Sequence, residues 1–183
     1  ITETGSQQCA SPVSRILAYS RAKAQALIPI LKREQTELGD TIRAVVICDY
    51  EKTSAVSAEL DHLLDDEAGG AIAAFRELLT DENTDKLDPV LITGSTVLVD
   101  DDLRPKLESA ALQWLSLNKF SVEFVWRESE GFHVLSGKGS DWCPRVYVEM
   151  ITELFQQGII RCLVGTRGLL GEGWDANKIN VLI

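Results

Sequence analysis

The segment 43–50, RAVVICDY, limits the fold more than any other part of the sequence. Its centre is a continuous run of apolar, largely β-branched residues without polar alternation, which is typical of a strand buried on both faces. Both faces of such a strand must be covered by other elements. Because segments with helical periodicity lie before and after it, we expect an α/β fold: a mostly parallel sheet with helices on both faces.

The same alternation of patterns continues along the chain. Helices are expected at 12–38, 53–65, 71–79, 102–117 and 144–157, and strands at 90–99, 120–126, 132–135, 159–164 and 179–183. Gly39 is the expected end of the first helix, and Pro29 the expected place of any break in it. An Asp side chain is expected to cap 102–117, while Pro144 and Gly158 mark the two ends of 144–157. Ligands of such sheets bind where strands end, so residues that follow strands are the first site candidates.

Charge is distributed unevenly over the 183 residues, whose net charge is -10. Residues 59–102 contain 13 acidic and two basic residues, and the remaining residues are close to neutral. This balance excludes the broadly basic surface of a stand-alone nucleic-acid binder. We expect the acidic block 59–102 to be a solvated insertion or edge that points away from any polyanion.

The chain contains neither a long apolar run nor a basic-then-apolar leader, which favours a cytoplasmic protein without contact to a membrane. Cys9, Cys48, Cys143 and Cys162 show no paired spacing, so reduced and mostly buried thiols are expected, without a metal site. Because the sequence lacks an initiator Met and stops inside an apolar run, we expect it to be a segment of a longer protein.

Two glycine-containing segments fail as phosphate loops. The pair Gly137-Lys138 would need a glycine where Phe132 stands and Ser or Thr where Gly139 stands. The segment 171–176, GEGWDA, is followed by a strand pattern where a dinucleotide-binding fold requires a helix. The sequence therefore contains no complete nucleoside-triphosphate site.

The segment 161–175, RCLVGTRGLLGEGWD, is more informative. A buried strand delivers Thr166 at its carboxyl end, four glycines lie within the nine positions 165–173, and Asp175 closes the loop. This arrangement resembles motif V of superfamily-two helicases. Its Glu-Gly-Trp-Asp ending is most similar to the type III restriction and excision-repair branches of these DEAD/DEAH-box enzymes.

Other elements follow in the order that the resemblance requires. Segment 43–50 with the helix after it is similar to motif IV, and 132–137 with the helix up to Gly158 is similar to the elements that lead into motif V. The resemblance implies a helical lead-in at 1–40 and a RecA-like helicase C-terminal domain at 41–183, incomplete at its C-terminus, with an insertion at about 66–131. The strands of the insertion are expected at one edge or outside the parallel sheet formed by 43–48, 132–135, 159–164 and 179–183. The family's phosphate loop, Asp-Glu motif and arginine motif would lie outside the chain.

The resemblance also implies roles for individual residues. Gly173 and Asp175 would bind nucleotide, with the Asp175 carboxylate at the ATP ribose. Nucleic acid would be contacted by Thr166, Arg167, Gly137, Lys138 and Asp49. Lys138, Arg145 and Arg167 follow successive strand ends and are expected to form one basic path.

Simpler roles remain open for the same residues. Thr166 can cap its turn, Asp175 can be a turn acid, and Arg167 and Asp49 can be surface charges. Packing is favoured for Trp174 over stacking on a base. Of the two histidines, His133 is expected to be a hydrogen-bonded core residue and His62 a surface residue.

We therefore expect the second motor domain of an ATP-dependent helicase or translocase, and favour DNA over RNA as its substrate. ATP and Mg²⁺ would be held mainly by the absent first RecA-like domain, so the isolated segment is expected to be inactive. The alternative is a non-catalytic α/β interaction module that uses the acidic block 59–102. A stand-alone enzyme ranks third, because no nucleophile, base and orienting residue occur together.

Overall fold

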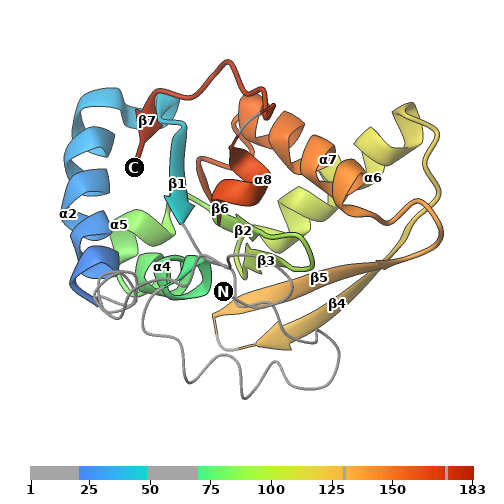
Figure 1. Cartoon of the computed structure of the whole chain (residues 1–183), viewed down its shortest axis with the longest axis horizontal. Coiled ribbons are helices and arrows are strands. Elements are labelled where there is room, and N and C mark those ends of the chain that lie inside the picture. The colour runs from blue at the N-terminus through green and yellow to red at the C-terminus, as the bar shows by residue number, and fades with distance from the viewer. Residues whose placement is uncertain (1–20, 49–69, 130, 172) are drawn as a thin grey trace, which may run out of the picture.

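The computed structural model describes residues 21–48, 70–129, 131–171 and 173–183. They form an α/β fold around a seven-stranded mixed sheet, in the order β4-β5-β3-β2-β6-β1-β7 (Figure 1). The strands are β1 (Ala44–Cys48), β2 (Pro89–Ile92), β3 (Val97–Asp100), β4 (Glu123–Ser129), β5 (Phe132–Lys138), β6 (Cys162–Thr166) and β7 (Val181–Leu182). The neighbours β2, β6, β1 and β7 are parallel, and β4, β5, β3 and β2 pair antiparallel. The expected α/β class is confirmed, and the arrangement is consistent with a RecA-like fold.

Helices cover both faces of the sheet (Figure 1). The helical elements are α2 (Arg21–Leu38), the short 3₁₀ turn η1 (Gly39–Thr41), α4 (Ala71–Leu79), α5 (Glu82–Asp85), α6 (Arg104–Leu117), α7 (Pro144–Gln157) and α8 (Arg167–Leu170). Side chains of α2 and α4 share one apolar core, and those of α6, α7 and α8 share the other.

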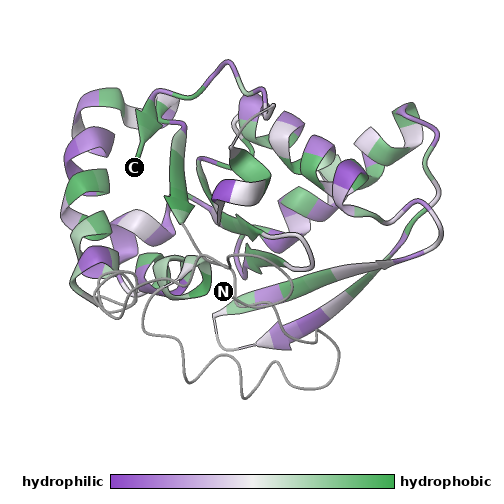
Figure 2. Cartoon of the chain, viewed as in Figure 1, coloured by the Kyte–Doolittle hydropathy of each residue, from purple (hydrophilic) through white to green (hydrophobic). Residues whose placement is uncertain are grey.

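Strand β1 shows why two cores form. Val45 packs in the core with α6 and α7, whereas its neighbours Ala44 and Val46 pack in the core with α2 and α4. All three are buried, since successive strand side chains point to opposite faces and both faces are covered. Figure 2 shows the hydrophobic colouring concentrated in these central strands, with hydrophilic residues on the outer helices.

Two helices begin and end where the sequence predicts. Helix α4 spans 71–79, and α7 begins at Pro144 and ends at Gln157. Gly158 follows α7 with φ 82°, the left-handed conformation that glycine adopts without steric cost. The inward face of α7 carries Val146, Tyr147, Met150, Ile151, Leu154 and Phe155, all of them buried.

Residues 90–99 do not form the single strand expected from the sequence. They form the antiparallel pair β2 and β3, joined by a turn in which the Thr93 N–H donates to the Thr96 carbonyl (2.8 Å). The Thr93 hydroxyl in turn accepts the Thr96 N–H at 3.0 Å. Both strands are apolar, so the sequence shows one apolar segment over 90–99. Only the short polar turn separates the two strands.

The expected position of the strands from 66–131 is also wrong. Segment 132–135 was expected beside 43–48, 159–164 and 179–183, with the strands of 66–131 at one edge or outside. Instead β2 is the parallel neighbour of β6, and β5 lies beyond β3 and pairs with it antiparallel. The four β2 residues are all buried, so this strand belongs to the centre of the sheet.

Several boundaries differ in detail. Helix α6 starts at Arg104 and its N-cap is Leu103, so the expected Asp cap is absent. Strand β4 extends from 123 to 129, β6 from 162 to 166, and β7 covers two residues only. Helix α2 continues through Pro29 without a break: Pro29 is exposed, while Leu27 and Leu31 on either side are buried.

The helix expected at 53–65 and the start of the one expected at 12–38 lie outside the described residues. Among the residues that are described, no helix has both the length and the apolar character needed to cross a lipid bilayer.

Candidate nucleotide and nucleic-acid interface

Thr166 ends the central strand β6 and is 7% exposed. On one side it is in register with Cys48, the last residue of β1. On the other side Gly165 pairs with Ile92, the last residue of β2, so Thr93 follows at the same level as Thr166. Three parallel strands therefore end side by side at this edge of the sheet.

The chain leaves β2 and β6 in opposite directions. After β2 it turns to β3, and after β6 it passes beyond β1 to β7. In open α/β sheets, ligands bind outside the carboxyl ends of strands at such a reversal. The position of Thr166 and of the 93–96 turn is thus the expected ligand-binding edge of this sheet.

Gly165 allows β6 to pass beneath the short helix α8. A Cβ atom at this position would lie 2.4 Å from Leu170 Cδ1 and 3.1 Å from the Ile92 carbonyl oxygen. A larger residue here would force the Leu170 side chain to move and would crowd the Ile92 carbonyl. The glycine therefore keeps Thr166 and α8 close to the end of β2.

The loop after α8 is attached to α7 by Trp174. The Trp174 indole N–H donates to the Thr152 hydroxyl at 2.8 Å, and its backbone N–H donates to the Gly171 carbonyl at 3.2 Å. Gly173 has φ 85°, a conformation that favours glycine. The side chain of Trp174 is half-buried, and Asp175 beside it is exposed.

This loop forms one wall of a groove of about 480 Å³. The other wall is the outward face of α7, and the end of α6 contributes one side chain. The groove is lined by Trp114, Pro144, Arg145, Val148, Glu149, Thr152, Glu153, Gln156, Leu169, Gly173, Trp174 and Asp175.

The predicted site residues separate into two groups. Thr166 and Arg167 lie together at the end of β6, and Arg167 is exposed. Gly173 and Asp175 lie together in the groove wall. Asp49 lies outside the described residues.

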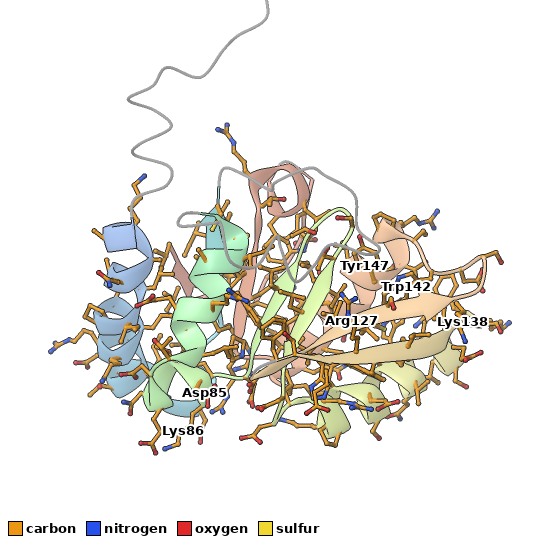
Figure 3. The ribbon with its side chains drawn as sticks, turned by 90° about the horizontal axis from the view of Figure 1, so that it is seen from below. Asp85, Lys86, Arg127, Lys138, Trp142 and Tyr147 are labelled. Atoms are coloured by element: carbon orange, nitrogen blue, oxygen red, sulfur yellow. The ribbon has the colours of Figure 1, made fainter. Side chains whose placement is uncertain are left out.

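Gly137 and Lys138 are not brought to Thr166. They end β5, which β3 and β2 separate from β6, and they lie beyond the last residue of β5 that pairs with β3. The Lys138 ammonium is ion-paired with Glu123 at 2.9 Å, and Figure 3 shows it on the β4–β5 hairpin. A Cβ on Gly137 would meet Trp142 at 2.6 Å, so packing accounts for this glycine. Strand β5 ends at the same sheet edge as β6 but with two strands between them, so the expected basic path through Lys138, Arg145 and Arg167 stays a prediction.

His133 was expected to be a hydrogen-bonded core residue. The structure confirms that it is buried but shows no hydrogen bond at its Nδ1 among the described residues. It is 8% exposed and packs edge-to-face against Trp126, with 6.1 Å between ring centroids. His62 lies outside the described residues.

Sequence reasoning missed the turn at 93–96. Thr93 is 1% exposed, and its carbonyl accepts the buried Tyr147 hydroxyl at 2.9 Å. This bond ties α7 to the same sheet edge that presents Thr166. The only sequence signal was the polar segment Thr-Gly-Ser-Thr inside an apolar run.

Several carboxylates of the acidic block 59–102 lie at the opposite edge of the sheet from Thr166. Strand β3 is antiparallel to β2, so its last residue, Asp100, lies where β2 begins, together with Asp85 and Asp88. Figure 3 shows Asp85 far from the Lys138 hairpin. Contrary to the expectation of a solvated block, Asp100 is 2% exposed. Its burial, reinforced by Asp85, Asp101, Asp102 and Asp88, raises its pKa to about 7.

The three described cysteines are free thiols. Cys162 is buried, which raises the pKa of its thiol to about 12, whereas Cys48 and Cys143 are half-buried. No group of three or more His, Cys, Asp or Glu side chains is placed to hold a metal ion in the described part of the chain.

Comparisons with protein-family models, curated proteins and solved structures return no match for this chain.

Proposed function

We propose that this chain is the second RecA-like domain of an ATP-dependent nucleic-acid motor. The observation that carries the proposal is the placement of Thr166 at the carboxyl end of β6, followed by a glycine-rich turn that leads to Asp175. A single connection thus presents a buried strand-end hydroxyl and an exposed carboxylate. The motif V resemblance assigns the first group to a nucleic-acid phosphate and the second to the ATP ribose.

The residues fit these contacts in chemical terms. Thr166 offers a hydroxyl and a backbone N–H at a strand end, and Arg167 beside it is an exposed cation, the residue type suited to phosphate oxygens. Such contacts to the backbone carry no sequence information, as a motor requires. The exposed Asp175 carboxylate can accept hydrogen bonds from ribose hydroxyls.

The described residues supply no phosphate loop and no metal-binding cluster. ATP and Mg²⁺ would therefore be held mainly by a first RecA-like domain, and hydrolysis would supply the free energy for movement. Within this chain, Thr166 and Arg167 would contact the nucleic-acid backbone. Asp175 would contact the ATP ribose when the two domains close around the nucleotide. DNA is favoured over RNA as the substrate, from the resemblance to the restriction and excision-repair branches.

Steady-state ATPase activity of the longer protein, with and without single-stranded DNA, tests the proposal. Thr166→Val keeps the shape and removes the hydroxyl, so it should weaken stimulation by DNA, with a loss of about 1 kcal/mol at one contact. Asp175→Ala should instead raise the ATP concentration needed for half-maximal activity. Glu37→Gln, an exposed change on α2, is the matched control.

Two results would count against the motor function. One is that both variants keep the stimulation and the ATP dependence of the unmodified protein, which would leave the loop with a structural role only. The other is that this chain alone releases phosphate from ATP, since the proposal places the phosphate-binding groups outside it.

A further inference from the structure

The groove along α7 carries charged side chains of which the motor function uses only Asp175. Besides Asp175, its walls carry two carboxylates, Glu149 and Glu153, and one cation, Arg145. No ion pair of Arg145 or Glu149 occurs among the described residues. An anionic ligand would meet net repulsion here, whereas a cationic one would be attracted.

The Thr152 hydroxyl and the Trp174 indole N–H in the groove are already engaged. The Thr152 hydroxyl donates to the Val148 carbonyl at 2.7 Å and accepts the Trp174 indole N–H at 2.8 Å. With its donor in use, Trp174 offers a ligand only its ring, and an aromatic face attracts cations. The groove therefore presents an aromatic ring beside carboxylates, a combination that recognises guanidinium or ammonium groups.

The length of the groove indicates a peptide rather than a small ion. Its lining on α7 runs from Pro144 to Gln156, which corresponds to about 18 Å at the helical rise per residue. Glu149 and Glu153 are one turn apart, about 6 Å along the axis. Side chains two residues apart on an extended peptide have nearly the same separation, roughly 6.6 Å, and point the same way.

We propose that this groove binds an extended segment of a partner protein that carries two arginines separated by one apolar residue. The two guanidinium groups pair with Glu149 and Glu153, and one of them lies against the ring of Trp174. The intervening residue faces away from α7 toward the loop at Leu169. This inference rests on Glu149, Glu153 and Trp174, none of which the motor function uses, so it does not depend on that function.

A peptide titration followed by NMR tests the proposal on the chain itself. The probe is Ac-Ser-Arg-Leu-Arg-Ser-NH2, added up to about 5 mM, and the signals are the Trp174 indole N–H and the α7 amides. We expect saturable shifts at these positions that weaken when salt is added, because the attraction is electrostatic. The peptide with Gln in place of both Arg residues should cause no saturable shift.

Variants and a reordered peptide separate this binding from general charge attraction. Glu149→Gln combined with Glu153→Gln should weaken binding about fivefold or more, while Glu37→Gln on α2 should leave it unchanged. Ac-Ser-Arg-Arg-Leu-Ser-NH2 has the same charge but the wrong spacing, and should bind less tightly. Equal binding of the two peptides, shifts centred elsewhere, or a silent Trp174 indole at the highest peptide concentration would each overturn the proposal. Stronger shifts at Trp174 with ATP than with the peptide would assign the groove to a nucleotide instead.

Discussion

Asp100→Asn measures how a buried carboxyl group affects the stability of the sheet. Asp100 ends β3, is 2% exposed, and its Oδ1 has no hydrogen-bond partner among the described residues. Burial is the main cause that raises its pKa from 3.8 to about 7, and repulsion by Asp85, Asp101, Asp102 and Asp88 adds to it. The folded protein therefore holds this proton more tightly than the unfolded chain does.

The sign of the pH dependence follows from this difference. Because the folded pKa is the higher one, the stabilisation is fully present below about pH 4 and is lost as the pH rises through about 7. A shift of this size corresponds to at most about 4 kcal/mol of unfolding free energy. Water screens the exposed carboxylates nearby, so we expect about 1–2 kcal/mol. Asn has nearly the same shape as Asp but does not titrate. The Asp100→Asn variant should therefore not lose this stability as the pH rises.

Urea unfolding followed by tryptophan fluorescence supplies the measurement. The unfolding free energy of Asp100→Asn minus that of the unmodified protein should increase by about 1–2 kcal/mol as the pH rises from about 5 to about 8. Asp102→Asn is the control, since it removes one exposed charge from the adjoining turn. Parallel pH profiles for Asp100→Asn and the unmodified protein would refute the reasoning. An equal gain in Asp102→Asn would show that total charge, and not the buried group, is responsible.

Two further predictions concern the edge that presents Thr166, and both are read from unfolding free energies. Tyr147→Phe keeps the ring contact with Trp142 and removes the hydrogen bond to the Thr93 carbonyl, so it should cost about 1 kcal/mol; unchanged stability would show that this bond does not hold α7 to the turn. Gly165→Ala places a methyl group against Leu170 and the Ile92 carbonyl and should cost about 1–3 kcal/mol. Gly168→Ala, where a Cβ meets nothing within 4 Å, is the matched control, and a larger loss there than at Gly165 would contradict the packing argument.

Local signals account for the elements that the sequence predicted well. Helix α7 is bounded by Pro144 and Gly158, and its apolar residues recur at helical spacing, so its bounds depend on nearby residues only. Strand β1 is recognisable because burial on both faces leaves a continuous apolar run. Thr166 could be placed at a strand end for the same reason, since β6 is apolar up to that residue.

Strand pairing determined the features of the fold that sequence patterns did not predict. Segment 90–99 folds back on itself at Thr93, but both halves are apolar, so periodicity did not reveal the turn. Strand β5 pairs with the returning strand β3, and this register carries Lys138 away from Thr166. Asp100 is buried because β3 lies between two covered strands, although its neighbours in sequence are exposed acids.

Chemical-shift mapping of this chain with a dodecameric oligo-dT tests the central claim most directly. At low ionic strength, where phosphate contacts are strongest, the motor function predicts saturable shifts at the Thr166, Arg167 and Gly168 amides and none at Asp85 or Asp88. These shifts should diminish in Thr166→Val and fade as salt is added. The contradicting result is that oligo-dT leaves the Thr166 and Arg167 amide signals unaffected, or shifts signals of β4 and β5 instead. In that case this sheet edge does not bind nucleic acid and the proposed function is wrong.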